Sequence, residues 1–157
     1  MLSWAMKLSA HFTLDELIAS QYAARHGIDN MPSDAIVANL ERLCADLLEP
    51  LRLVVGRPIV VSSGYRSPEV NKAIGGSNGS AHMLGLAADI TVPGLSVQAV
   101  CREIVKLKQP FDQIIDEYSS WVHVAIAAKN KKPRSQQLVA RRFGQGGQTV
   151  YSITSFN

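Results

Sequence analysis

The sequence predicts an α+β fold, with a small antiparallel sheet flanked by N-terminal helices. Two patterns carry this prediction. Apolar residues recur at helical spacing over the first 54 residues, whereas short β-branched runs bounded by glycine and proline follow from residue 58 onward. Helices that precede the strands are typical of α+β domains. The chain has 157 residues, of which 46% are apolar and 18% charged, as in an ordinary globular domain.

A capping box predicts where the first helix begins. Thr13 is followed three residues later by Glu16, so each side chain can bond the backbone amide of the other residue. We expect this helix to continue to about His26, where Gly27 can adopt the left-handed conformation that ends many helices.

A longer helix is predicted to begin after Ser33. Its apolar residues recur at intervals of three and four as far as Val54, which indicates a wide buried stripe, and Pro50 should kink or divide it. Cys44 belongs to this stripe, and Cys101 has similar apolar neighbours at helical spacing. We therefore interpret both cysteines as small buried residues rather than as a disulfide framework or a zinc site.

The rest of the chain predicts strands around one further helix. Residues 64–86 contain five glycines and predict a structured loop with a helical turn after Pro68. Ser96 is the expected cap of a helix that continues to residue 107. The expected strands are 58–63, 87–92, a hairpin of 111–117 with 121–127, and an added strand at 149–153.

Charge divides the chain into two segments. Residues 1–128 carry ten basic and thirteen acidic residues, a net charge of −3, whereas residues 129–157 carry six basic residues and no acid. This basic C-terminal segment suggests attraction to a polyanion such as a cell-wall polymer, nucleic acid or lipid surface, and the alternative is a solvated, partly mobile end of the chain. No aromatic residue interleaves with its charges before Phe143, so a stacking platform for nucleic acid is not favoured.

Membrane insertion is not expected. The longest apolar stretches are a handful of residues, against the roughly 20 that a spanning helix requires. The first residues also lack the basic region and apolar core of a secretory signal, which leads us to expect cytoplasmic synthesis.

Three residues could together hold a metal ion: His82, Asp89 and His123. Asp89 lies between Ala88 and Ile90 on a predicted buried strand, where a carboxylate needs a partner. A metal shared with two imidazoles would supply that partner and leave an open position on tetrahedral zinc, in which water becomes more acidic. The alternative is that the three residues are separate and structural.

Sequence motifs around these residues are specific. Ser63–Pro68 reads SGYRSP, Ser80–Ile90 reads SAHMLGLAADI and Trp121–Val124 reads WVHV, with Asn71 and a glycine pair at 75–76 between the first two. In this order they resemble the zinc D-alanyl-D-alanine carboxypeptidase family, over roughly residues 10 to 127. That family includes D,D-dipeptidases of vancomycin resistance and L-alanyl-D-glutamate endopeptidases of phage lysins, and the likeness is greatest to its short phage and bacterial branch.

The resemblance implies a zinc D,D-peptidase (hedgehog/DD-peptidase-like) fold in residues 1–128, with Zn²⁺ held by His82, Asp89 and His123. It also implies hydrolysis of a peptide bond in the peptidoglycan stem, which could be D-Ala–D-Ala, L-Ala–D-Glu or a cross-bridge bond. We expect a monomer with no specific nucleic-acid partner. Such an enzyme would act on the cell wall once released, as phage lysins do.

Further residues are assigned to the substrate by the same resemblance. Arg66 matches the family arginine that binds substrate or stabilises the oxyanion, a role that suits a guanidinium because the charge develops in the transition state. Ser80 and Tyr65 are also placed at the substrate. The alternatives are that Arg66 is a surface residue in a turn and that Ser80 merely orders its loop.

One departure from the family concerns the catalytic acid. Known members carry it three residues before the last histidine, where this chain has Ser120. Asp116 and Glu117 are the nearest carboxylates, and the hairpin loop decides between them. A three-residue loop puts Glu117 on the face of His123, whereas a two-residue loop puts Asp116 there. We favour Glu117 because its longer side chain reaches further.

Two other functions compete with peptidase activity. A non-catalytic, zinc-containing cell-wall-binding or virion structural module would explain the missing glutamate at position 120. A nucleic-acid-associated protein would use the basic C-terminal segment, with an affinity that weakens steeply with salt.

Overall fold

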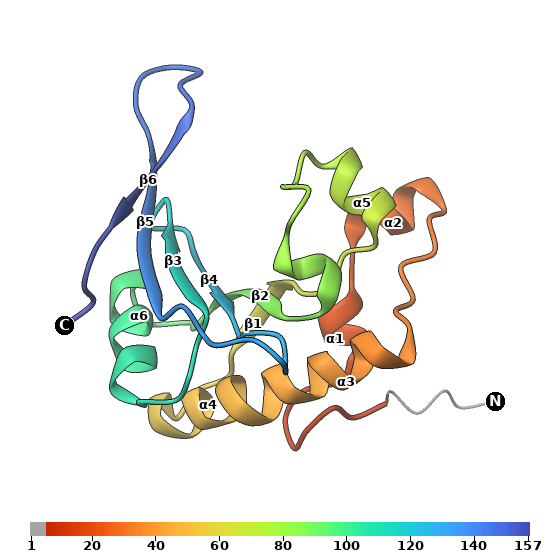
Figure 1. Cartoon of the computed structure of the whole chain (residues 1–157), viewed down its shortest axis with the longest axis horizontal. Helices are drawn as coiled ribbons and strands as arrows, with labels where there is room; N and C mark the ends of the chain where they lie inside the picture. The colour runs from red at the N-terminus through yellow and green to blue at the C-terminus, as the bar shows by residue number, and fades with distance from the viewer. Residues whose placement is uncertain (1–5) are drawn as a thin grey trace.

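A computed structural model describes residues 6–157 as helices packed against one six-stranded sheet (Figure 1). This confirms the α+β class. The strands are arranged in the order β1-β2-β4-β3-β5-β6. The helices are α1 (Leu14–Ile18), α2 (Gln21–His26), α3 (Asp34–Leu43), α4 (Glu49–Val55), α5 (Pro68–Ala73) and α6 (Val97–Lys106). The strands are β1 (Val60–Ser63), β2 (Ala87–Thr91), β3 (Gln113–Glu117), β4 (Trp121–Ala125), β5 (Gln136–Arg142) and β6 (Thr149–Ile153).

The first predicted helix is divided into two. The capping box of Thr13 and Glu16 is present, but α1 ends at Ile18 and the backbone of Ala19 is extended. Ser20 then begins α2, its hydroxyl accepting a hydrogen bond from an amide of the new first turn. The prediction of one continuous helix was therefore wrong, because a second capping residue lies inside the apolar pattern. Gly27 ends α2 in the left-handed conformation, as expected.

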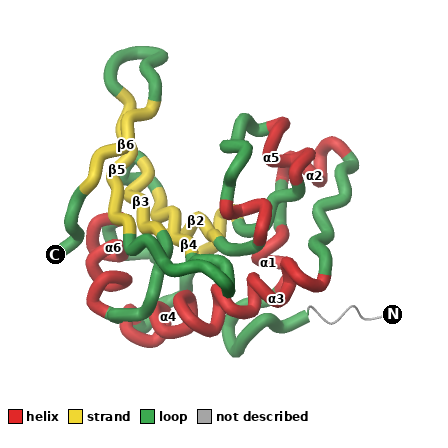
Figure 2. The backbone as a smooth tube through the Cα atoms, viewed as in Figure 1, coloured by secondary structure: helices red, strands yellow, loops and turns green. Residues whose placement is uncertain are grey.

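The long helix begins at its Ser33 cap and is interrupted before Pro50, as predicted. The interruption is a π-helical turn (Cys44–Leu48), in which the amide of Glu49 bonds to the carbonyl of Cys44 five residues earlier. Figure 2 shows α3 and α4 along the base of the molecule. Cys44 and Cys101 are both free and buried, and burial raises the pKa of each thiol to about 12.

The sheet is mixed rather than antiparallel. Four of its strand pairs are antiparallel, but β3 and β5 are parallel. The added strand at 149–153 is confirmed as β6, whereas β5 was not predicted. Its sequence is rich in Gln and Arg, and only Leu138 and Ala140 are buried, so the hydrophobic signal is weak. The basic C-terminal segment thus supplies two strands of the sheet.

The two faces of the sheet differ. Ile114, Val122 and Val124 are fully buried and belong to the main core, which also contains the apolar faces of α3, α4 and α6. The opposite face carries the polar residues that form the candidate site. Within residues 6–157, none of the helices is long and apolar enough to cross a bilayer.

Candidate metal centre

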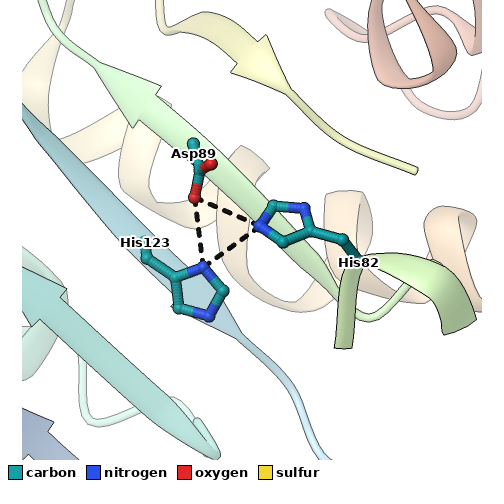
Figure 3. Close-up of side chains that lie close together, drawn as sticks. All are labelled: His82, Asp89 and His123. Carbon is teal, nitrogen blue, oxygen red and sulfur yellow. Dashed lines mark hydrogen bonds and ion pairs between the residues drawn. The ribbon is translucent and has the colours of Figure 1, made fainter. Parts of the chain in front are cut away.

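Three side chains predicted as metal ligands converge on one point (Figure 3). Asp89 on β2 and His123 on β4 are directly opposite each other in the sheet, and His82 approaches from a 3₁₀ turn (Ala81–Leu84). His82 Nε2 lies 3.2 Å from His123 Nδ1 and 3.2 Å from Asp89 Oδ1, and His123 Nδ1 lies 3.1 Å from that same oxygen. Residues far apart in the sequence therefore offer three ligand atoms to one ion.

The triangle of ligand atoms fits a zinc ion. Ligands about 2.0–2.1 Å from tetrahedral zinc lie about 3.3 Å from one another, close to the three separations of His82, Asp89 and His123. Two imidazoles and one carboxylate are also the donor set of catalytic zinc sites, in which three protein ligands leave one position for water or substrate.

The orientation of His82 is fixed by the backbone. Its ring is 2% exposed, and Nδ1 lies 2.7 Å from the carbonyl oxygen of Gly64. Because a carbonyl only accepts hydrogen bonds, Nδ1 carries the proton and Nε2 presents its lone pair to the centre. Gly85 ends the 3₁₀ turn in the left-handed conformation, which returns the chain to β2 and Asp89.

Asp89 is ionised at this centre. Burial alone would raise its pKa, but the hydrogen bond with His123 and the adjacent His82 ring hold the pKa of this carboxyl well below the usual range. An ionised carboxylate between two imidazoles is the protonation state that metal binding requires.

The three ligands open onto a cleft of about 720 Å³. The cleft is lined by Arg66 and the loop after α5, and by side chains of β3, β4, β5 and β6. Figure 1 shows α5 on one side of the molecule and the strands β5 and β6 on the other. The sequence did not predict that β5 and β6 contribute to this cleft, because residues 129–157 were interpreted as a basic segment. The period-2 pattern of Leu138 and Ala140 was the available signal.

The hairpin register separates the two candidate acids. Tyr118–Ser120 form a three-residue loop, Glu117 pairs with Trp121, and Ile115 pairs with His123, as in the favoured alternative. Glu117 consequently lines the cleft beside the metal ligands. Partial burial raises its pKa above the ordinary glutamate value, and the nearby carboxylate of Asp89 acts in the same direction.

Asp116 points to the other face of the sheet. It is 1% exposed and pairs with Arg141, with Oδ2 and Nη2 3.0 Å apart. It also accepts hydrogen bonds from Gln98 and from the amide of Ser119. Asp116 therefore has a structural environment and does not line the cleft.

The residues assigned to substrate differ in position. Arg66 lines the cleft, donates a 3.3 Å hydrogen bond to Ser80 Oγ, and has a buried Nε without a hydrogen-bond partner among residues 6–157. Ser80 lines the cleft too, and its hydroxyl accepts a hydrogen bond from the amide of His82, so it also orders the 3₁₀ turn. Tyr65 is 5% exposed and packs in the core; the structure does not bring it to the cleft.

Gly64 should not tolerate a side chain, because a Cβ there would lie 2.2 Å from the carbonyl oxygen of Leu17. We expect Gly64→Ala to lower the free energy of unfolding by about 1–3 kcal/mol through overpacking. Zinc affinity should also fall by roughly 10–100-fold, because the displaced carbonyl orients His82. Gly79→Ala is the control, since no atom lies within 4 Å of a Cβ there. Urea unfolding and zinc competition measure both effects, and equal behaviour of the two variants would contradict the prediction.

Comparison with known protein families agrees with the motifs. The family model described as Peptidase M15 matches residues 10–125, which include all three proposed ligands, Arg66 and Glu117. None of the curated proteins matches the chain significantly. The match covers well over half of the 157 residues. The chain therefore belongs to the Peptidase M15 family, the zinc-dependent peptidases of the D-alanyl-D-alanine carboxypeptidase type, as its motifs predicted.

Proposed function

We propose that this protein is a zinc metallopeptidase that hydrolyses a peptide bond in peptidoglycan stem peptides, of the D-Ala–D-Ala carboxypeptidase or L-Ala–D-Glu endopeptidase type. The observation that carries the proposal is the convergence of His82, Asp89 and His123 on one point within a cleft that also contains Glu117. Family membership supports a metallopeptidase, and the motif resemblance to cell-wall peptidases supports the substrate.

The chain supplies the groups that hydrolysis needs. Zinc bound by the three ligands would act as a Lewis acid and lower the pKa of water at the centre. Glu117 takes the proton from the attacking water and returns it to the leaving amine, a role favoured by its raised pKa. Arg66 lines the cleft and offers positive charge to the carbonyl oxygen as negative charge develops there.

Digestion of purified muropeptides tests the proposal. We expect the zinc-loaded protein to release fragments whose masses identify the bond cleaved. EDTA should abolish the cleavage and added zinc should restore it. The same muropeptides with zinc but no protein are the control. Cleavage that persists in zinc-free protein would refute the metallopeptidase mechanism, and the absence of any cleavage by zinc-loaded protein would refute the substrate assignment.

The non-catalytic alternative depended on Ser120 at the position of the family glutamate. Glu117 lines the cleft and offers a carboxylate despite that difference. The alternative predicts zinc binding and cell-wall binding without hydrolysis, so muropeptide digestion together with a cell-wall binding assay separates the two.

A further inference from the structure

The basic C-terminal segment forms one wall of the cleft. Side chains on the same face of neighbouring strands follow one another across the sheet: Glu117 pairs with Ala140, and Ala140 pairs with Tyr151. Arg142 lies two residues beyond Ala140 on β5 and therefore shares this face. Arg142 and Tyr151 both line the cleft with the metal ligands.

Tyr118 supports Arg142 in this wall. The guanidinium carbon of Arg142 lies 5.3 Å from the centre of the Tyr118 ring, within cation–π range. The Tyr118 ring contacts Trp121 edge-on at 5.7 Å, and its hydroxyl bonds to the hydroxyl of Thr149 on β6. Tyr118 has a φ of 59°, an unfavourable conformation for a bulky residue, which these contacts must stabilise.

Arg142 differs from its neighbouring arginines in having no acidic partner. Arg134 pairs with Asp112 at 2.8 Å, and Arg141 pairs with Asp116 on the other face. Within residues 6–157, Arg142 makes no ion pair. Its planar fork of donors is therefore free to bind a carboxylate in two-point geometry.

The spacing of the strands sets how far a substrate would extend. Leu138 is level with His123 across the sheet, because both pair with Ile115. Arg142 lies four residues further along β5 and two strands away from β4, a Cα separation of about 16 Å from His123 at ordinary strand spacings. An extended peptide covers this distance with about four or five residues, and fewer when the arginine side chain reaches toward the centre.

We propose that Arg142, held on the Tyr118 ring, binds a carboxylate of the peptide substrate at a position remote from the bond that is cleaved. The inference rests on the proposed function and extends it, because it assigns the C-terminal segment to substrate recognition. A carboxylate could come from the peptide's C-terminus or from the free α-carboxylate of its D-Glu residue.

Peptide binding tests this role separately from activity. The Glu117→Gln protein, supplied with zinc, is titrated calorimetrically with a stem pentapeptide that ends in D-Ala–D-Ala. Two further peptides each carry one amide, at the C-terminus or at the D-Glu α-carboxylate. Adding Arg142→Gln should weaken binding of the unmodified peptide about fivefold, the range of a single exposed charge pair. Arg142→Lys should restore part of the loss.

The control variant is Lys132→Gln, which removes one charge of the same segment outside the cleft. It should leave binding unchanged. One of the two amidated peptides should bind equally well with and without Arg142, which identifies the carboxylate. Equal weakening of all three peptides, or no weakening of any, would overturn the role of Arg142 alone. Failure of every peptide to bind before Arg142 is changed would instead reject the proposed substrate, and this inference with it.

Discussion

Glu117→Gln is expected to lower kcat for stem-peptide cleavage by roughly 10²–10⁴-fold, the usual contribution of a general acid–base residue. Glutamine has almost the same shape as glutamate but cannot accept the proton. Glu117 is not one of the three converging metal ligands, so zinc stoichiometry should be unchanged. Its side chain lies at the cleft surface, so the thermal midpoint should also change little. Steady-state kinetics on a defined stem peptide, with zinc content measured on the same samples, check the prediction.

Asp116→Asn is the matched control, since it makes the equivalent change one residue earlier in the strand. Asp116 is buried against Arg141 on the far face of the sheet. We expect this variant to lose about 1–3 kcal/mol of stability, because an amide nitrogen would face donors that now bond to a carboxylate. The folded variant should retain cleavage within a few-fold. The reverse result, an active Glu117→Gln and an inactive but folded Asp116→Asn, would move the acid–base role to Asp116.

The sequence alone predicted the candidate metal ligands but left the choice between Asp116 and Glu117 open. The candidate ligands His82, Asp89 and His123 could be proposed from the sequence because their spacing and small neighbours form a specific motif, and the structure brings the three together. The choice between Asp116 and Glu117 depended on the length of one hairpin loop. A loop one residue shorter would place Asp116, instead of Glu117, on the same face of the sheet as His123. The structure places Glu117, and not Asp116, on the cleft face through the pairing of Glu117 with Trp121.

The C-terminal wall of the cleft was harder to predict, for a different physical reason. Strand β5 pairs in parallel with β3 through a connection that begins after β4, and such pairing leaves no local turn signal. Its charge pattern also indicated a solvated segment. Arg141 and Arg142 are adjacent but point to opposite faces, one toward Asp116 and the other toward the cleft. The two arginines have different partners because successive side chains of a strand point to opposite faces of the sheet.

Removing a ligand should have an effect at least as large as removing the acid. We expect His123→Ala to lose zinc during dialysis and to show no measurable cleavage, because only Asp89 and His82 would remain at the centre. The unchanged protein should keep about one zinc per chain. At a zinc concentration 100 times the Kd, binding stabilises the folded state by about 2.7 kcal/mol, which corresponds to roughly 5–10 °C in Tm for a chain of this size.

The zinc-dependent shift in Tm separates a metal ligand from a merely structural histidine. His123→Ala should show no such shift, whereas His26→Ala should show the full one, because His26 is exposed on α2 and its ring bonds only to the carbonyl of Tyr22 among the described residues. Without zinc, both variants should unfold within a few degrees of the unchanged protein. A His123→Ala protein that still binds zinc and cleaves would mean that these three residues do not form the metal centre. Loss of activity with the zinc-dependent shift intact would assign His123 to the substrate instead.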